Sequence, residues 1–357
     1  MQGEMIMAEI AETTDIRALI VDTGRLLLEK GLVARTWGNI SCRNSETTFA
    51  ISPSGLGYEN MTSEDVPIYD YVNDTYEGSR KPSSEKKIHS AAYKIYPDVN
   101  FVIHTHQDYA TVVGLVGTDN LKMTEEESKI LGPIVVAEYG LPGTDTLRKN
   151  VEAAYAKGSK VVLMIHHGVV ILGDDCEDAI KKAEILEEIC RRTISEALPD
   201  ALSGVDEVAA RRSISEDDSN AENGGSDKNA EDLIADIKNA VIVSDSNILF
   251  CADNGGLPAQ IDDIVQMTGS KIKAVSKNKA AVARALKKKS VVLVKGVGCV
   301  ISEADADDAK ALEMLVKKAA LASRYTSKYK VTARLSLLDC LIMRAVYTMK
   351  YSKQKKG

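Results

Sequence analysis

The stretch that most constrains this chain is Phe101–Tyr109, a short apolar run that ends in two histidines separated by one residue. Val102 and Ile103 predict a buried strand, and alternate side chains of an extended chain point the same way. His104 and His106 would then face one side at the strand end, where paired imidazoles commonly bind a divalent transition metal. Two solvent-facing histidines at a strand end would also explain this pattern.

The distribution of histidines places any metal site in the first half of the chain. All five lie between residues 89 and 167, and His167 follows a second apolar run, Val161–Ile165. Two ligands close in sequence plus one distant ligand leave an open coordination position, as in catalytic rather than structural zinc sites. Glu85, ahead of the pair, is the kind of carboxylate that acts as acid or base beside a metal-polarised carbonyl.

Composition excludes several classes of protein. The net charge of -7 and the pI near 5.5 argue against a nucleic-acid or anionic-membrane surface. The longest apolar run is too short to span a bilayer, and the N-terminus has no basic region followed by an apolar stretch. The six cysteines are widely spaced, which fits reduced, buried thiols. We therefore predict a cytoplasmic protein without nucleic-acid or membrane partners.

A change of composition divides the chain. Residues 213–232 consist mainly of Ser, Asn, Gly and acidic side chains, which predicts a flexible acidic linker. The linker would join a catalytic domain over residues 1–212 to a second domain over residues 233–357. Two domains also fit the length of 357 residues.

The second half of the chain repeats part of the first. Residues 291–309 match residues 161–179 at nine of nineteen positions without a gap, and Phe250–Leu257 resembles Phe49–Leu56. These matches predict a shortened, degenerate copy in tandem that keeps a hairpin and the late strand. The copy would lack a counterpart to the segment from Glu85 to His106.

Two polar turns in the first half are suited to an oxyanion. Ser52–Gly55 ends a predicted strand in a turn with free backbone N–H groups, and Ser83 or Ser84 is a plausible N-cap of a helix. As plain turns and caps, neither needs a function. Combined with a metal and a carboxylate, however, they describe carbanion chemistry beside a carbonyl, with a metal-stabilised enediolate.

The order of short motifs carries a resemblance to a known family. TWGNIS, SPSG, KPSSE, HTH and HHG follow one another over about residues 10–195, and this series resembles the class II aldolase/adducin family, which includes L-fuculose-1-phosphate aldolase. The resemblance implies an α/β fold, a three-layer α/β/α sandwich around a largely antiparallel sheet, here duplicated in tandem. It also implies a homo-oligomer, or a pseudo-oligomer that uses both copies.

The resemblance implies a role for each matching residue. Zn²⁺, or another divalent transition metal, would be bound by His104, His106 and His167, and Glu85 would be the catalytic acid/base. The substrate phosphate would be bound by Gly38, Asn39, Ser54, Gly55, Ser83 and Ser84. His166, which precedes the third ligand, would not coordinate the metal.

The function that the resemblance implies is cleavage of a ketose 1-phosphate to dihydroxyacetone phosphate and an aldehyde. The same site could instead serve a sugar-phosphate epimerase, dehydratase or decarboxylase, although the family's epimerases carry Asp where this chain has Glu85. An adducin-like scaffold would be non-catalytic, but such relatives lose metal ligands. Lys295 suggests a Schiff-base aldolase, yet the eight βα repeats of a barrel are missing.

One part of the family's machinery has no clear match. The family aldolases use a tyrosine from the region after HTH to protonate the intermediate, and this chain has Thr124 and an acidic run there. Tyr139 lies at a different point in the sequence. A second family tyrosine comes from the C-terminal segment, and Tyr347 or Tyr351 of the second half could serve in its place.

Overall fold

The chain divides into two compact units, unit 1 (Met1–Thr193) and unit 2 (Ile194–Gly357). The computed structural model describes residues 15–202, 210–211 and 228–354. The predicted first domain extended to residue 212, whereas Asp200 and Ala201 already belong to unit 2. The guanidinium of Arg324 donates two hydrogen bonds to the Asp200 carboxylate, and the Asn247 amide donates one to the Ala201 carbonyl.

The predicted linker also ends earlier than expected. Residues 213–227 lie outside the described residues, but residues 228–232 form most of helix α8 (Lys228–Ile234). This helix carries Leu233 and Ile234 into the hydrophobic core of unit 2. The burial of these two side chains explains why the polar residues ahead of them are helical.

Unit 1 is built on an eight-stranded sheet with the order β4-β3-β2-β1-β5-β8-β7-β6. Its strands are β1 (Asn39–Arg43), β2 (Thr48–Ile51), β3 (Ile68–Asp70), β4 (Thr75–Glu77), β5 (Phe101–Thr105), β6 (Ile134–Ala137), β7 (Val161–Met164) and β8 (Gly168–Gly173). Only β6 and β7 are parallel neighbours, and every other pair is antiparallel. The sheet is therefore mixed and largely antiparallel, as predicted.

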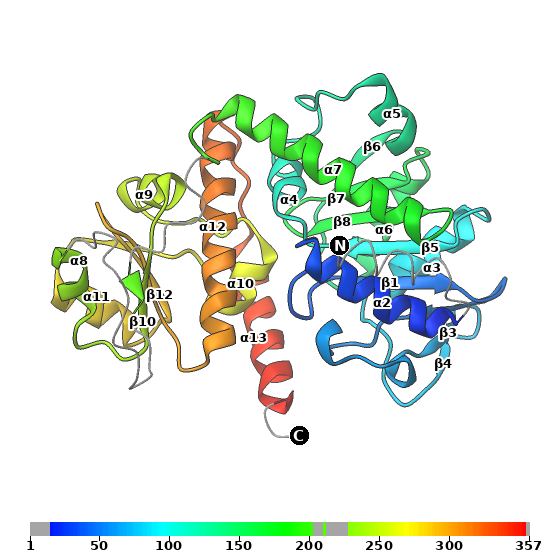
Figure 1. Ribbon diagram of the computed structural model, residues 1–357, viewed down its shortest axis with the longest axis horizontal. Helices are drawn as coiled ribbons and strands as arrows, with labels where there is room; N and C mark the ends of the chain where they lie inside the picture. Colours follow the sequence, from blue (N-terminus) through cyan, green and yellow to red (C-terminus); the bar gives the residue numbers. More distant parts are fainter. Residues whose placement is uncertain (1–14, 203–209, 212–227, 355–357) are drawn as a thin grey trace. The chain divides into compact units, whose positions relative to one another are not determined.

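Helices cover both faces of this sheet (Figure 1). The helices of unit 1 are α2 (Ile16–Glu29), α3 (Lys86–Ile95), α4 (Asp108–Gly114), α5 (Glu125–Leu131), α6 (Asp145–Tyr155) and α7 (Cys176–Ala197), with short 3-10 turns at Tyr58–Asn60 and Ser63–Asp65. α3 and α6 pack against one face in a core that includes Ile88, Leu147 and Val162. α2 and α7 lie on the other face, where the Thr23 hydroxyl contacts the Cys176 thiol at 3.0 Å.

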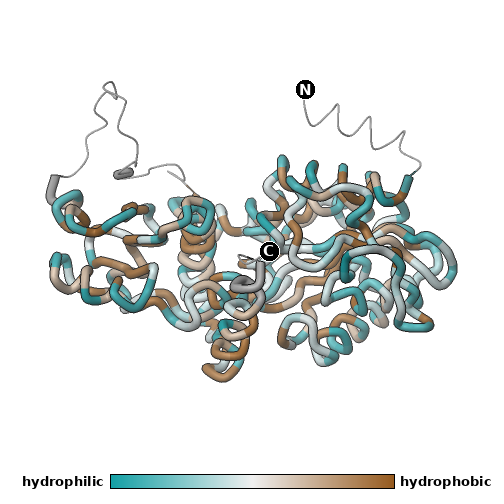
Figure 2. Tube along the Cα trace, turned by 90° about the horizontal axis from the view of Figure 1, so that it is seen from below, coloured by the Kyte–Doolittle hydropathy of each residue, from teal (hydrophilic) through white to brown (hydrophobic). Residues whose placement is uncertain are grey.

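Unit 2 has a five-stranded sheet with the order β11-β12-β13-β10-β9. Its strands are β9 (Ala210–Arg211), β10 (Ala240–Val243), β11 (Ala274–Val275), β12 (Val291–Val294) and β13 (Gly298–Ser302). After α8 its helices are α9 (Ser246–Asp253), α10 (Asp262–Thr268), α11 (Lys279–Leu286), α12 (Ala306–Lys328) and α13 (Leu337–Gln354). Figure 2 shows hydrophobic segments in the interior of each unit, and α13 adds exposed apolar side chains, among them Leu337, Leu338 and Leu341.

Part of the predicted repeat is wrong. Phe250–Asp253 end helix α9, whereas Phe49–Ile51 lie in strand β2, so unit 2 has no copy of that hairpin within its described residues. The Asp245 carboxylate accepts a hydrogen bond from the backbone N–H of Ile248 and caps the helix. Buried residues at helical spacing, Ile248, Cys251 and Ala252, then keep this segment helical.

The remainder of unit 2 follows the second part of unit 1 element by element. From α3 to α7, and from α8 to α12, the order is helix, strand, two helices, strand, helix, two strands and helix. β10 pairs antiparallel with β13 as β5 pairs with β8, and β11 pairs parallel with β12 as β6 pairs with β7.

β10 of unit 2 takes the sheet position that β5 has in unit 1, although the sequence predicted no counterpart to the segment of the two histidines. Val300 of β13 faces Ile242 of β10, and Val170 of β8 faces His104 of β5. Ile242 thus occupies the ladder position of His104. The prediction failed because the two strands share only apolar character, and the ladder register becomes visible only in the paired sheet.

All six cysteines are buried free thiols, as the sequence predicted. Burial raises the pKa of these thiols; for Cys42 the pKa rises to about 11. Within the described residues, none of the helices combines the length and the apolar character that a bilayer crossing needs.

Candidate metal centre

Three histidines from two neighbouring strands converge in unit 1. β5 ends in His104 and His106, and the turn between β7 and β8 supplies His167. The ring centroids of the three imidazoles lie 4.7 to 4.9 Å from one another, and one nitrogen of each lies within 4.8 Å of the others. His104 and His167 are buried and His106 is half-buried, so the cluster lies at the edge of the core with one side open.

The hydrogen bonds of His104 fix which nitrogen is available to a ligand. Nδ1 lies 2.8 Å from the carbonyl oxygen of Val169, which can only accept, so Nδ1 carries the proton. Nε2 is then the ring nitrogen that faces Nε2 of His106 and is left for a metal. A backbone carbonyl that orients a histidine in this way is typical of metal-binding imidazoles.

Two of the three nitrogens lie close to the spacing that a tetrahedral metal requires. Nε2 of His106 lies 3.0 Å from Nε2 of His104. Around a zinc ion with bonds of about 2.0–2.1 Å, neighbouring ligand nitrogens lie about 3.3–3.4 Å apart. Two lone pairs this close repel unless a cation or a proton lies between them. The donor set of three imidazoles and a carboxylate suits Zn²⁺ and other divalent transition metals.

Glu85 lies against this cluster at the N-cap position of α3, where the sequence predicted Ser83 or Ser84. Its Oε1 lies 3.0 Å from Nε2 of His167, and its Oε2 lies 3.2 Å from Nε2 of His104. Only 8% of Glu85 is exposed. Burial alone raises the pKa of this carboxyl, but the imidazoles of His167 and His104 hold the pKa well below its usual range. The side chain is therefore an ionised carboxylate.

A chain of buried hydrogen bonds, which the sequence did not reveal, holds Glu85 from behind. The Asn39 amide donates from Nδ2 to Oε2 of Glu85 at 3.0 Å, and its Oδ1 accepts from Nε2 of His89. Nδ1 of His89 then accepts from the Ser41 hydroxyl at 2.6 Å, and Ser41 Oγ accepts from the Tyr93 hydroxyl at 2.8 Å. An ionised carboxylate can only accept, and each following group is then left with one possible role, so the direction of donation along these hydrogen bonds is determined.

His89 is neutral in this chain. Burial and, to a smaller extent, the nearby His104 lower the pKa of His89 to about 3, although Glu85 opposes the shift. The sequence contained a signal for this contact, because His89 follows Glu85 by four residues and such residues share one face of a helix. Asn39 and Ser41, two residues apart in β1, similarly point to the same face of the strand.

The two polar turns form one loop cluster at the start of α3. The backbone N–H of Ser54 donates to the Lys81 carbonyl at 2.9 Å, and the N–H of Ser83 donates to the Ser52 carbonyl at 3.2 Å. Ser83 is buried and Ser84 is exposed. The structure thus brings together four of the six predicted phosphate residues, Ser54, Gly55, Ser83 and Ser84.

The other two predicted phosphate residues have different contacts. Gly38 has a φ of +87°, and a Cβ there would lie 2.6 Å from the backbone oxygen of His104. Only glycine allows the chain to pass so close to the end of β5. The side chain of Asn39 lies between Glu85 and His89. Both residues therefore support the histidine cluster and its carboxylate.

His166 occupies a strained position beside the cluster. Its φ is +69°, a conformation that costs a non-glycine residue roughly 1–2 kcal/mol. The corresponding turn of unit 2 has Gly296, with a φ of +64°. The His166 ring packs edge-on against Tyr139, with centroids 5.3 Å apart. This contact places Tyr139 next to the residue that precedes His167.

The geometry of unit 1 agrees with the chain's similarity to known proteins. Residues 18–194 match the family described as Class II Aldolase and Adducin N-terminal domain. A 5-deoxy-D-ribulose 1-phosphate aldolase from Bacillus thuringiensis serovar kurstaki is 35% identical over 48% of this chain and 80% of its own length. The chain therefore belongs to the class II aldolase/adducin family.

Two further relatives differ in the reaction that their names give. An L-fuculose phosphate aldolase from Methanococcus maripaludis is 30% identical over 47% of this chain and 89% of its own length. An L-ribulose-5-phosphate 4-epimerase, UlaF, from Salmonella paratyphi B is 28% identical over 54% of this chain and 90% of its own length. The similarity therefore supports an enzyme of this superfamily and leaves aldol cleavage and epimerisation to be distinguished.

Proposed function

We propose that unit 1 is a metal-dependent aldolase that cleaves a ketose 1-phosphate to dihydroxyacetone phosphate and an aldehyde. The observation that carries this proposal is the position of the Glu85 carboxylate within 3.2 Å of two of three converging imidazoles. Two of the three relatives described above are aldolases by name, and one of these names includes a ketose 1-phosphate.

The histidine cluster would hold the metal, and Glu85 would transfer the proton at the reacting carbon. A Zn²⁺ ion bound by His104, His106 and His167 would act as a Lewis acid on the substrate carbonyl. Glu85, within 3.2 Å of Nε2 of His104 and of His167, would exchange a proton with the carbon beside that carbonyl. The buried chain from Asn39 would keep the carboxylate oriented during this exchange.

The proposed reaction balances without a further reactant. The bond between C3 and C4 of the ketose breaks, and its electron pair stays with C3 in the phosphate-bearing half. The C4 hydroxyl loses its proton as C4 becomes the aldehyde carbon. Glu85, once it has taken up a proton equivalent to the one released from the C4 hydroxyl, would deliver it to C3, which becomes the hydroxymethyl carbon of dihydroxyacetone phosphate, so that no net proton is consumed. The loop cluster of Ser54, Gly55, Ser83 and Ser84 would bind the phosphate mainly through its serine hydroxyls, because the backbone N–H groups of Ser54 and Ser83 already donate to the carbonyls of Lys81 and Ser52.

Epimerisation of a sugar phosphate is the second candidate, and the similarity to UlaF favours it. Such an enzyme would use the same metal and break the same kind of carbon–carbon bond, but would rejoin the halves. A non-catalytic scaffold is disfavoured because unit 1 keeps three converging histidines and a carboxylate beside them.

A product assay distinguishes these candidates. Purified protein supplied with Zn²⁺ is incubated with L-fuculose 1-phosphate, 5-deoxy-D-ribulose 1-phosphate and L-ribulose 5-phosphate. Dihydroxyacetone phosphate is then measured through its enzymatic reduction. We expect this product from at least one of the 1-phosphates and none after chelation of the metal. Conversion of L-ribulose 5-phosphate to its epimer, without a triose phosphate from either 1-phosphate, would show an epimerase instead.

We further propose that unit 2 is a degenerate tandem copy of the second part of unit 1. The shared order of elements, the equal strand directions and the nine identities support this origin. Ile242 and Val297 stand where unit 1 has His104 and His167, so the copy would bind no metal there. The prediction of a cytoplasmic homo-oligomer or pseudo-oligomer also remains part of the proposal, and light scattering on the purified protein would measure the assembly.

His89 is expected to be a positioning residue for Glu85. Because leucine can neither donate to Asn39 nor accept from Ser41, His89→Leu should lower kcat about 10–100-fold with little change in KM. Glutamine offers one donor and one acceptor, so His89→Gln should recover most of the loss. Steady-state kinetics of both variants, with melting temperatures, test this expectation. Equal kcat values in the two variants would show that the hydrogen-bond chain does not act on Glu85.

A further inference from the structure

Unit 2 contains a cavity of about 790 Å³. It is separate from the positions of Ile242 and Val297, which correspond to His104 and His167 of unit 1. Its walls come from the C-terminal ends of α9 and α12, the loop 254–260, the segment 270–273 and residues 330–340 up to the start of α13. A volume of this size lies within the range of small-molecule sites. Every lining residue belongs to unit 2, so the cavity exists within that unit alone.

The charge of this cavity is opposite to that of the chain. Four cationic side chains line it, and no aspartate or glutamate does. These cations are Lys271, Lys273, Lys330 and Arg334. The chain as a whole has a net charge of -7. Unbalanced cations around a concave surface raise the local concentration of anions.

The four cations are available to a ligand. All are exposed, and among the residues that the structure describes their side chains form neither ion pairs nor hydrogen bonds. In the same unit, by contrast, Arg324 is bound by Asp200, and Lys318 lies 3.7 Å from Asp263. The cavity thus concentrates four cations that form no ion pair with a described acidic side chain, although Asp339 and Asp262 lie near Cys340 of its wall and raise the pKa of that thiol.

The floor of the cavity is mixed in character. Cys251, Leu257 and Cys340 are buried apolar residues, and the Gln260 amide donates to the Thr326 hydroxyl at 2.9 Å. Further hydroxyls line the walls, from Ser270, Ser323, Ser327 and Thr332. A ligand that fits this surface has an anionic group at the rim and a compact, hydroxylated or partly apolar body.

The backbone on one side of the cavity is held in a fixed geometry. Gly256 has a φ of +111°, and a Cβ there would lie 2.2 Å from the Ile272 carbonyl oxygen. The close approach allows Leu257 and Ile272 to exchange two backbone hydrogen bonds of 2.9 Å. Lys271 and Lys273 flank Ile272, so this bridge positions the segment that carries two of the four cations.

We propose that this cavity binds a small organic phosphate, independently of the metal centre of unit 1. A phosphate monoester is close to a dianion at neutral pH and has three strong acceptor oxygens. Lysines bind such a group as point charges, and arginine adds a bidentate contact. Three lysines, one arginine and the hydroxyls of Ser270, Ser327 and Thr332 in one cavity fit this chemistry better than that of a neutral ligand.

The test is calorimetric titration of the full-length protein with glucose 6-phosphate and with adenosine 5′-monophosphate. Glucose and adenosine serve as ligands without phosphate. We expect saturable binding of at least one of the two phosphates. Whether the sugar phosphate or the nucleotide binds shows which kind of organic group the cavity accepts. Lys273→Ala combined with Arg334→Ala should weaken this binding at least about tenfold, because two charge-assisted contacts are lost.

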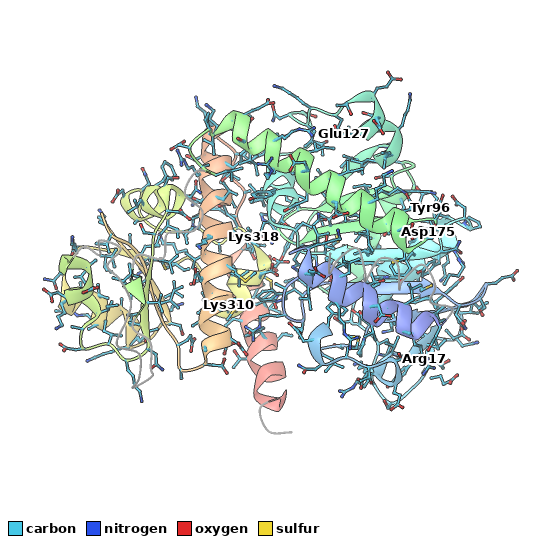
Figure 3. The ribbon with its side chains drawn as sticks, in the orientation of Figure 1. Arg17, Tyr96, Glu127, Asp175, Lys310 and Lys318 are labelled. Atoms are coloured by element: carbon cyan, nitrogen blue, oxygen red, sulfur yellow. The ribbon has the colours of Figure 1, made fainter. Side chains whose placement is uncertain are left out.

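Lys310→Ala is the matched control. Lys310, labelled on α12 in Figure 3, is exposed and lies about 20 Å along the helix from Ser323. It should leave the affinity unchanged. Ser83→Ala combined with Ser84→Ala controls for binding in unit 1 and should also leave it unchanged. Lack of binding by either phosphate at millimolar concentration, unchanged affinity in the cavity variant, or loss only in the serine variant would overturn the proposal.

Discussion

Replacing His104 with alanine should remove the metal from the purified protein and reduce turnover about 10³-fold or more. Only two imidazoles would remain, and a Lewis acid contributes several kcal/mol to such a reaction, where each 1.4 kcal/mol corresponds to a factor of ten. Metal content by elemental analysis and turnover of the ketose 1-phosphate are the measurements. His106→Ala repeats the test at a half-buried position, where the substitution disturbs the core less.

His166→Gly is the matched control for the metal. His166 precedes His167 but faces Tyr139, and glycine adopts its φ of +69° without strain. This variant should therefore keep the metal and melt no lower than the wild type. Stoichiometric metal in both His104→Ala and His106→Ala would contradict the assignment of the centre. If the wild-type protein purifies without metal and takes up none when Zn²⁺ is added, the non-catalytic scaffold would be favoured instead.

Glu85→Gln should keep the metal and still lower turnover about 10²–10⁴-fold, the usual contribution of a general acid or base. Glutamine has the shape of glutamate but cannot exchange a proton at pH 7. The three histidines are unchanged, so metal content should stay near that of the wild type. Exchange of the C3 proton of dihydroxyacetone phosphate in D₂O, followed by NMR, reports the proton transfer without requiring the aldehyde.

The exchange experiment also separates Glu85 from other acids. If Glu85 moves the proton, Glu85→Gln loses the exchange and Glu85→Asp keeps a reduced rate, because the shorter side chain still carries a carboxylate. Exchange at the wild-type rate in Glu85→Gln would show that another group moves the proton. Tyr139 is then the next residue to test, because its ring packs against His166 beside the cluster.

The three converging histidines were predictable from the sequence because the relevant geometry is local. His104 and His106 follow a buried strand, and the two-residue period of an extended chain places them together. His167 was predictable from a second strand that ends in the same way. That these two strand ends meet was an expectation of the family resemblance, and the antiparallel pairing of β5 with β8 and of β8 with β7 brings them together.

Unit 2 shows where sequence comparison alone misleads. The string Phe250–Leu257 resembles Phe49–Leu56, but an N-cap at Asp245 and apolar residues at helical spacing make its first half a helix. Conversely, β10 and β5 share little beyond their apolar character and still occupy the same place in their sheets. Sheet position is determined by pairing between distant segments, which a short string does not encode.

The sequence by itself determined the family, the histidines, the carboxylate at Glu85 and the loops that could bind a phosphate, because each depends on residue type and local spacing. Only the tertiary structure decided that Asn39, His89, Ser41 and Tyr93 form one hydrogen-bonded chain behind Glu85. It also decided that four cations from separate segments of unit 2 surround one cavity. These arrangements join residues from different elements, and only the packing of the folded chain brings them within hydrogen-bond distance or around a common space.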